Sequence, residues 1–240
     1  MSRLSRRTFV GTTAAGLLAW PAGLRSFAAD AGPNLQIAPF RFDVSPPIGH
    51  PCCGGWITPV VGYDDAQEAI GFVLLGAGKP IVICAVDWTG ILNQAHVDFR
   101  TALADAAGTT PDRVAVQCVH QHNAPFACLE AERITQEQGD LPHIVDVDFF
   151  RRCLDAGRVT VREALSRERP VTHIASGQAK VEKVASNRRI LGEDGKVRVM
   201  RGSSSRNPEL RALPEGLIDP WLKTVAFLDG ETKVAARHYY

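Results

Sequence analysis

The sequence lacks an excess of charge of either sign, and its body lacks a long hydrophobic run. Its 27 Lys and Arg stand against 26 Asp and Glu, which gives a formal net charge of +1. Nucleic acids and anionic membranes attract proteins through a concentrated positive field, which this balance does not provide. A bilayer span takes about 20 apolar residues in a row. We therefore expect no nucleic-acid partner and no transmembrane segment.

The sequence also lacks the cysteine pattern of a small disulfide scaffold. Its six cysteines are few and irregularly spaced for such a fold. Cys84 and Cys118 lie inside apolar runs, which predicts buried thiols. The neighbours Cys52 and Cys53 have poor geometry for bridging each other. A Gly-x-Ser-x-Gly motif is absent as well, so nothing supports a serine esterase.

The N-terminus has the pattern of an export signal. Arg6-Arg7 precedes a weakly apolar stretch from Gly11 to Trp20, and Phe27-Ala28-Ala29 offers small residues for cleavage. A charged start, an apolar middle and a small-residue exit are typical of a signal peptide, and the arginine pair indicates the twin-arginine route. We expect residues 1–29 to be removed and residues 30–240 to form one domain in the periplasm or outside the cell.

The rest of the chain mixes strand and helix patterns. The predicted strands include a hairpin of two apolar runs around Gly76-Ala77-Gly78-Lys79, and helices are predicted from Leu92 to Ala107 and from Asp148 to Arg167. The other predicted strands are Phe40 to Val44, Val114 to Val119, Val171 to Ile174, Ala179 to Val184, Val197 to Met200 and Lys223 to Leu228.

This succession predicts an α/β fold with a mixed β-sheet and flanking helices. The run from Ile81 to Val86 is apolar without alternation, and it and the run from Val114 to Val119 are expected to be buried strands, the first on both faces. The segment from Arg201 to Pro220 is rich in Ser, Pro, Asn and Arg, which predicts a long loop.

The chemistry centres on His120-Gln121-His122, directly after the predicted strand that ends at Val119. In an extended segment, residues i and i+2 point to the same side. Ligand sites of α/β folds form at such strand ends. Imidazole is the commonest metal ligand and works as an acid or base near neutral pH. The alternative is a chance pair of surface or core histidines.

The surrounding residues resemble the neutral, non-lysosomal ceramidase family. The run from Val119 to Pro125 is similar to the family's Thr-His-Thr-His-Ser-Gly-Pro motif, and the run from Asp43 to Pro47 is similar to its opening Asp-Ile-Thr-Pro-Pro segment. Gly54-Gly55-Trp56 stands where the family has a glycine-containing turn, and Asn187-Arg188 resembles its Asn-Arg pair. The ordered set covers nearly all of the chain beyond the signal.

The resemblance implies a zinc-dependent amidohydrolase with an N-terminal catalytic domain, acting on a linear amide such as an N-acyl sphingolipid. It implies that His120 binds Zn²⁺, that His122 is catalytic beside the metal-bound water, and that Arg188 steadies the substrate or its oxyanion. Gly54 and Gly55 are expected to line the substrate pocket. We expect the two histidines to share a cleft with these glycines and Asp87.

Two further readings remain open. Asp87 ends a strand and could orient His120 as an outer carboxylate, or simply cap the following turn. His50-Pro51-Cys52-Cys53 could bind a metal, although no second cluster is visible.

The motif departs from the family: Gln121 replaces a threonine, and Asn123-Ala124 replaces Ser-Gly. This puts the substrate in doubt more than the metal, and leaves open hydrolysis of an ester or a sugar-linked amide. The resemblance places the remaining zinc ligands beyond Tyr240, so we expect a truncated chain that is inactive alone. The rival hypothesis is an exported, non-catalytic binding protein on the same scaffold.

Overall fold

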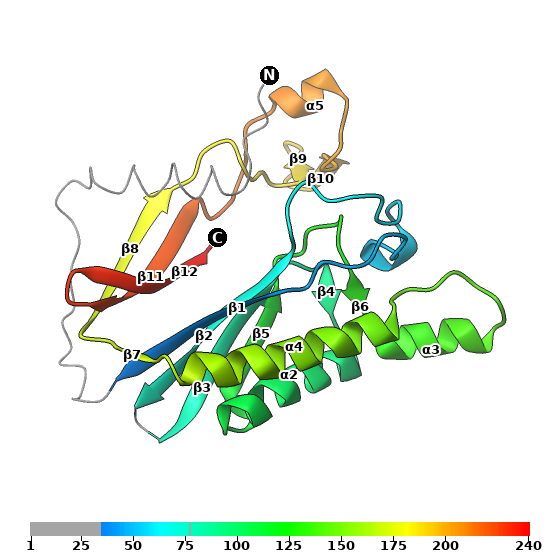
Figure 1. The fold of residues 1–240 in the computed structure, drawn as a ribbon. Coiled ribbons are helices and arrows are strands. Elements are labelled where there is room, and N and C mark those ends of the chain that lie inside the picture. The colour runs from blue at the N-terminus through cyan, green and yellow to red at the C-terminus, as the bar shows by residue number, and fades with distance from the viewer. Residues whose placement is uncertain (1–34, 77) are drawn as a thin grey trace.

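A computed structural model describes residues 35–76 and 78–240. The predicted signal peptide, residues 1–29, lies outside the described residues. The described chain folds into a mixed β-sheet with two long helices on one face and a smaller sheet near the other (Figure 1). The predicted α/β class is therefore confirmed. No described helix is long and apolar enough to cross a membrane.

The main sheet has five strands in the order β5-β3-β2-β1-β7. Strands β1, β2 and β3 are antiparallel neighbours, which confirms the predicted hairpin, while β5 runs parallel to β3. A parallel connection needs a crossover, and helix α2 supplies it. The five strands are β1 (Gln36–Asp43), β2 (Glu68–Gly76), β3 (Gly78–Val86), β5 (Val114–Cys118) and β7 (Arg169–Pro170).

Both long helices match their sequence predictions. Helix α2 (Asn93–Ala107) ends at Gly108, whose φ of 64° is a left-handed conformation that glycine adopts without strain. Helix α4 (Val147–Leu165) begins after Asp146, whose carboxylate accepts a hydrogen bond from the backbone N–H of Phe149 at 2.9 Å. The two helices lie side by side over the sheet (Figure 1).

The main core lies between this helix pair and the sheet. Val82, Cys84 and Val86 face the helices and are fully buried, while Ile81 on the opposite face is 39% exposed. The expectation that Ile81 to Val86 is buried on both faces is therefore wrong. The helices cover one face, and the other face is covered only in part. Strand β5 shows the same alternation of buried and exposed residues.

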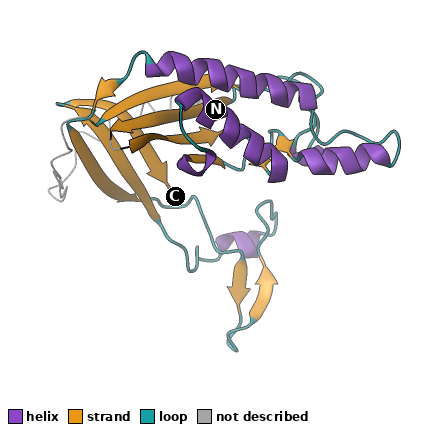
Figure 2. Cartoon of the chain, turned by 90° about the horizontal axis from the view of Figure 1, so that it is seen from below, coloured by secondary structure: helices purple, strands orange, loops and turns teal. Residues whose placement is uncertain are grey.

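The smaller sheet has the order β12-β11-β8 and packs on the main sheet through a small apolar cluster (Figure 2). Phe227 of this sheet meets Phe72 of β2 with ring centroids 5.2 Å apart. Its strands are β8 (His173–Lys180), β11 (Trp221–Asp229) and β12 (Thr232–Tyr239). The two strands predicted at Val171 to Ile174 and Ala179 to Val184 are one strand, because β11 pairs with β8 without a break from His173 to Lys180.

A lobe of residues 187–214 projects away from the helices (Figure 2). It contains the hairpin β9 (Arg189–Leu191) and β10 (Val197–Met200) and the short helix α5 (Pro208–Ala212), which lies within the predicted long loop. The buried guanidinium of Arg201 holds the lobe together. It donates to the carbonyls of residues 187, 210, 213 and 214 at 2.8–3.2 Å.

The remaining elements are short and lie mostly near the ends of the main strands. The sequence patterns did not predict helix α3 (Leu129–Glu137). The short strands β4 (Gly90–Ile91) and β6 (Phe126–Ala127) follow β3 and β5 in the sequence and pair with each other in parallel. Two 3-10 turns complete the set, η1 (Cys53–Gly55) and η2 (Pro111–Arg113).

Candidate functional site

Three of the predicted site residues, Asp87, His120 and His122, lie just beyond the carboxyl ends of β3 and β5. The two strands run in parallel with Val86 opposite Cys118, so the segments that follow them leave the same edge of the sheet. Residues 87–90 follow β3, and residues 119–125 carry both histidines after β5. The edge where parallel strands end is where ligands of open α/β sheets bind.

His120 has an unusual backbone and a fixed ring. Its φ is +64°, in the left-handed region that residues with a Cβ rarely adopt. Its Nδ1 lies 2.8 Å from the carbonyl oxygen of Thr89. A carbonyl can only accept, so Nδ1 carries the proton and Nε2 keeps a free lone pair. Metal-binding histidines commonly have this arrangement, with the outer nitrogen bonded to a carbonyl or carboxylate.

The ring of His122 lies beside that of His120. The ring centroids are 5.2 Å apart and the planes are nearly perpendicular, at 89°. Strand alternation is not the reason, because β5 ends at Cys118 and His120 is left-handed. The turn itself brings the rings together. On its other side, His122 packs against the exposed indole of Trp56 at a centroid distance of 5.4 Å.

The glycine turn lies against the histidine segment, but neither Gly54 nor Gly55 lines either of the two depressions at this site, so their place in the substrate pocket remains a prediction. Gly54 and Gly55 belong to η1 and have φ of 66° and 88°, which only glycine adopts at little cost. The neighbouring N–H of Cys53 donates to the carbonyl of Ala124 at 2.8 Å. A Cβ at Gly54 would touch the ring of Phe126 at 3.5 Å, whereas Gly55 faces open space.

Asp87 is hydrogen-bonded to the histidine segment through its main-chain carbonyl. Its carbonyl accepts a hydrogen bond from the side-chain amide of Gln121 at 2.8 Å, and its carboxylate accepts from the N–H of Glu68 at 3.1 Å. The Nδ1 of His120 is held by Thr89. The role of Asp87 in orienting His120 thus remains a prediction.

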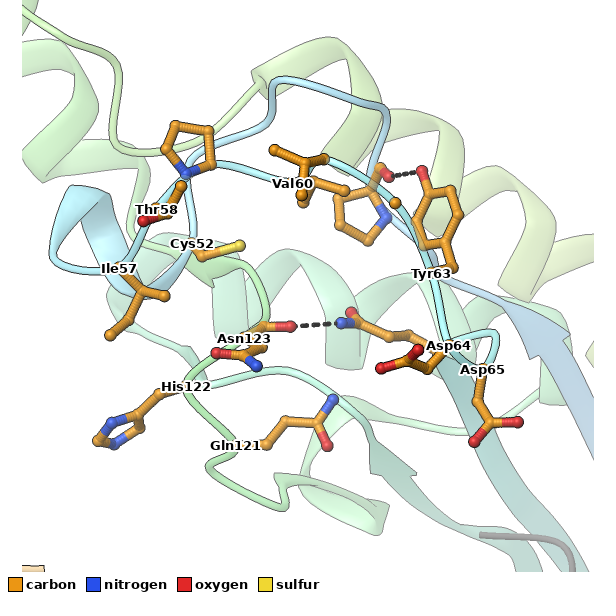
Figure 3. A pocket seen from close by; sticks show the side chains of 15 residues that line it. Cys52, Ile57, Thr58, Val60, Tyr63, Asp64, Asp65, Gln121, His122 and Asn123 are labelled. Carbon is orange, nitrogen blue, oxygen red and sulfur yellow. Dashed lines mark hydrogen bonds between the residues drawn. The ribbon is translucent and has the colours of Figure 1, made fainter. Parts of the chain in front are cut away.

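Two adjoining depressions flank the histidine pair. The larger has a volume of about 850 Å³ and is lined by His122 together with Gln121 and Asn123. Its opposite wall is the segment from Ile57 to Asp65 (Figure 3). His120 lines the smaller depression, of about 420 Å³. We expected one cleft shared by both histidines. The structure has two depressions instead, one lined by His122 and the other by His120.

The larger depression has an apolar side and an acidic side. Ile57 lies toward one end, the carboxylates of Asp64 and Asp65 lie toward the other, and Val60 lies between them (Figure 3). The hydroxyl of Tyr63 donates to the carbonyl of Pro46, which holds this wall to the strand end. Sequence reasoning missed this wall, because the segment has no recognisable motif.

Arg188 lies apart from these groups in the described contacts. It precedes β9 on the projecting lobe, its side chain is exposed, and its carbonyl accepts from the N–H of Arg201 at 2.8 Å. It lines neither of the two depressions. Its predicted contact with substrate is not visible in the structure and remains a prediction.

His50 has a structural environment. Its ring is buried, its Nδ1 lies 2.7 Å from the carbonyl of Pro51, and its Nε2 accepts from the N–H of Asp146 at 3.2 Å. Burial lowers the pKa of His50. With both nitrogens engaged, this ring joins the segment before η1 to the start of α4. The arrangement does not favour metal binding at His50 and the adjacent cysteines.

The described residues do not complete a metal centre. Among residues 35–76 and 78–240, no three or more His, Cys, Asp or Glu side chains gather in a way that could hold a metal ion. A catalytic zinc site normally has three protein ligands and one open position. His120 suits one ligand position through its free Nε2, and the other positions are not filled from these residues.

Comparison with solved structures places this fold beside ceramidases. The neutral ceramidase of Pseudomonas aeruginosa superposes with a TM-score of 0.62 at 18% identity, over 86% of this chain and 31% of that one. A ceramidase complexed with C2 gives a TM-score of 0.59 at 17% identity, over the same shares. No protein-family model and no curated protein sequence matches the chain.

The structural likeness shows a ceramidase-like fold. The chain spans about a third of the length of these two neighbours. The fold predicted from the sequence resemblance is thus confirmed, while the activity of the whole protein is a separate question.

Proposed function

We propose that this chain carries the histidine-bearing part of the active site of an amide hydrolase. The observation that carries the proposal is the pair of imidazoles, 5.2 Å apart at the ends of parallel strands, on a ceramidase-like fold. One of the two rings has a hydrogen bond that leaves Nε2 free. The chain spans about a third of the length of the structural neighbour, so amide hydrolysis by this protein is itself part of the proposal.

The roles proposed for the residues follow from what each can donate or accept. His120 would offer the lone pair of Nε2 to a zinc ion, although the described residues do not gather a full set of ligands around it. Bound zinc would activate water and polarise the amide carbonyl. His122, which packs between Trp56 and His120, would donate a hydrogen bond to the oxyanion, or take a proton from the attacking water and pass it to the leaving nitrogen.

The substrate class proposed is a linear amide with an apolar acyl chain, such as an N-acyl lipid. Two observations support it. The solved neighbours are ceramidases. The lining of the depression beside His122 includes Ile57, Val60 and Val61, the last of which is 84% exposed. An acyl chain would remove this apolar surface from water.

The test compares His122→Ala with His173→Ala in the intact gene product. His173 is an exposed histidine on β8 that lines neither depression, so its replacement controls for loss of an imidazole. Cleavage of a fluorescent N-acyl amide is expected to fall by at least about 10²-fold in the first variant only. Equal turnover by both variants would refute the role of His122.

A second candidate function is a non-catalytic binding protein on the same scaffold. It is favoured by the absence of a complete ligand set among the described residues. Elemental analysis of the intact protein separates the two. Stoichiometric zinc that is lost in His120→Ala, with chelator-sensitive turnover, supports the hydrolase. A metal-free protein that still binds N-acyl lipid supports the binding protein.

We further propose export through the twin-arginine route, on the strength of Arg6-Arg7 and the apolar stretch behind them. Replacing both arginines by lysine is expected to leave precursor in the cytoplasm, as seen by fractionation and immunoblotting. Unchanged export of that double variant would exclude this route.

A further inference from the structure

The two segments at the strand ends are joined by a dense set of hydrogen bonds. The N–H of Val119 donates to the carbonyl of Val86, and the N–H of His120 donates to that of Trp88, both at 3.1 Å. The side chain of Gln121 reaches back to the carbonyl of Asp87. The turn that carries the histidines is thus shaped by the segment after β3, about thirty residues earlier in the chain.

Thr89 is the centre of this set, and all of its polar groups are engaged. It is 2% exposed. Its N–H donates to the carbonyl of Pro125 at 2.9 Å, and its carbonyl accepts from Nδ1 of His120 at 2.8 Å. Its hydroxyl lies 2.6 Å from the carbonyl of Gln121 and 3.0 Å from that of Ala124. The single hydroxyl proton is shared between these two acceptors.

The turn that Thr89 contacts is strained. A left-handed residue with a Cβ is strained and persists only where its surroundings hold it. His120 is such a residue, with φ of +64°. The hydroxyl of Thr89 binds the carbonyls on the far side of this strained position, and its own carbonyl binds the imidazole. One buried side chain therefore acts on both the backbone and the ring.

We propose that Thr89 is the positioning residue of the site. Through its carbonyl it sets the tautomer and direction of the His120 ring, and through its hydroxyl it fixes the turn that places His122 beside that ring. Thr89 touches no reacting atom in this scheme and acts through the histidines. The consequence for catalysis rests on the proposed hydrolase function, whereas the consequence for the ring does not.

The first measurement needs no variant and no activity. Ring nitrogen signals are recorded from ¹⁵N-histidine-labelled protein at pH 8.5, where an ordinary imidazole is neutral. The signals of His120 are assigned by their loss in His120→Gln. The proton is expected on Nδ1, giving two widely separated nitrogen signals. A proton on Nε2 would overturn the proposal.

The second measurement removes the hydroxyl. Thr89→Val is expected to draw the two His120 nitrogen signals together as the tautomers mix, and Thr89→Ser is expected to restore the wild-type pattern. Thr109→Val is the matched control, since its hydroxyl makes a 2.6 Å bond to the carbonyl of Pro80 far from the site. Unchanged signals in Thr89→Val, or equal changes in Thr109→Val, would overturn the proposal. If Thr89→Val does not fold, Thr89→Ala is judged by the same criterion.

Turnover separates this inference from the proposed function. In an active protein, Thr89→Val is expected to lower kcat by about 10- to 100-fold with little change in KM, as for other residues that orient a catalytic or ligating histidine. An inactive wild-type protein with the expected ring signals would reject the hydrolase and keep the positioning role. An active protein in which Thr89→Val has wild-type kcat would reject the positioning role alone.

Discussion

Residues 35–171 and residues 173–240 differ sharply in how they are held together. The first region contains nearly all of the buried apolar side chains, packed between α2, α4 and the five-stranded sheet. In the second region only Arg201 and Phe227 are buried. The histidine pair stands on the first region, and Arg188 stands on the second. The histidines therefore lie on a region with a large packed core, whereas the region that carries Arg188 has few buried side chains to hold it in place.

The largest effect on stability is expected at Trp88, in the middle of the first region. Its indole is fully buried against Phe99, Phe149 and Phe150, and its Nε1 donates to the carbonyl of Val44 at 3.0 Å. Trp88→Ala should lower the free energy of unfolding by about 3–5 kcal/mol, because it leaves a cavity and an unpaired carbonyl. Urea unfolding followed by circular dichroism measures the change.

The matched variant in the second region is Phe227→Ala. Phe227 belongs to a cluster of four buried residues that joins the two sheets. Its loss should cost less, about 3 kcal/mol and so the lower end of the range for such a truncation, since the site is close to solvent and can relax. Equal losses in Phe227→Ala and Trp88→Ala would contradict the contrast between the regions.

Arg188 tests whether the second region contributes to the site. If its guanidinium reaches the substrate carbonyl when substrate is bound, Arg188→Ala should lower kcat/KM by about 10²-fold. Arg189→Ala is the control, because Arg189 is an exposed neighbour with the same charge and begins the same hairpin. Steady-state kinetics on the amide substrate decide. Wild-type kinetics in Arg188→Ala would confine the site to the first region.

Arg201 tests how independent the projecting lobe is. Its guanidinium donates to four carbonyls of the lobe and its surroundings. Arg201→Met removes these charge-assisted bonds and should lower the free energy of local opening by about 1.5–3 kcal/mol. Hydrogen exchange of residues 187–214 is expected to speed up while exchange in α2 and α4 stays the same. Exposed Arg206→Met should change neither; faster exchange in α4 would show that lobe and core open together.

The smallest effect is expected at the His143–Glu132 pair, within the first region. His143 Nδ1 lies 2.5 Å from the carboxylate of Glu132, and this hydrogen bond raises the pKa of His143. A raised pKa contributes stability that is fully present below about pH 6.5 and is lost as the pH rises through the folded-state value. His143→Gln should therefore cost more at pH 6 than at pH 9. The imidazole is 67% exposed, so the difference should stay below about 1 kcal/mol.

Glu132 behaves in the opposite sense. Burial raises its pKa, but the bonds from His143 and the N–H groups of Ile144 and Val145 outweigh this, and the pKa is lowered. The lowered pKa of Glu132 contributes to the free energy of unfolding above about pH 4.5. This contribution is therefore the same at pH 6 and at pH 9. In a Glu132→Gln background, the pH dependence of the His143→Gln effect should vanish in urea unfolding. If the pH dependence persisted in the Glu132→Gln background, it would have to come from other titratable groups.

Much of the fold could be predicted from local patterns. The β2–β3 hairpin, β5, α2 and α4 all follow from apolar periodicity and from turn residues such as Gly108. Helix α3 was not predicted, because its amphipathic pattern is short and its buried side chain is a glutamate, Glu132. The partial exposure of the second face of β3 could not be predicted either. It depends on how far the smaller sheet, which is distant in the sequence, extends over that face.

For the candidate site, the sequence by itself predicted which residues carry the chemistry, and it determined that both histidines follow a strand. His120-Gln121-His122 after an apolar run indicated a strand-end site, and the glycine turn was placed beside it. Only the tertiary structure decided that His120 is left-handed, that its ring binds the carbonyl of Thr89 and that Trp56 packs against His122. These features depend on contacts between segments 31 or more residues apart. Local periodicity carries no information about such pairings, because their geometry is set when β3 and β5 align.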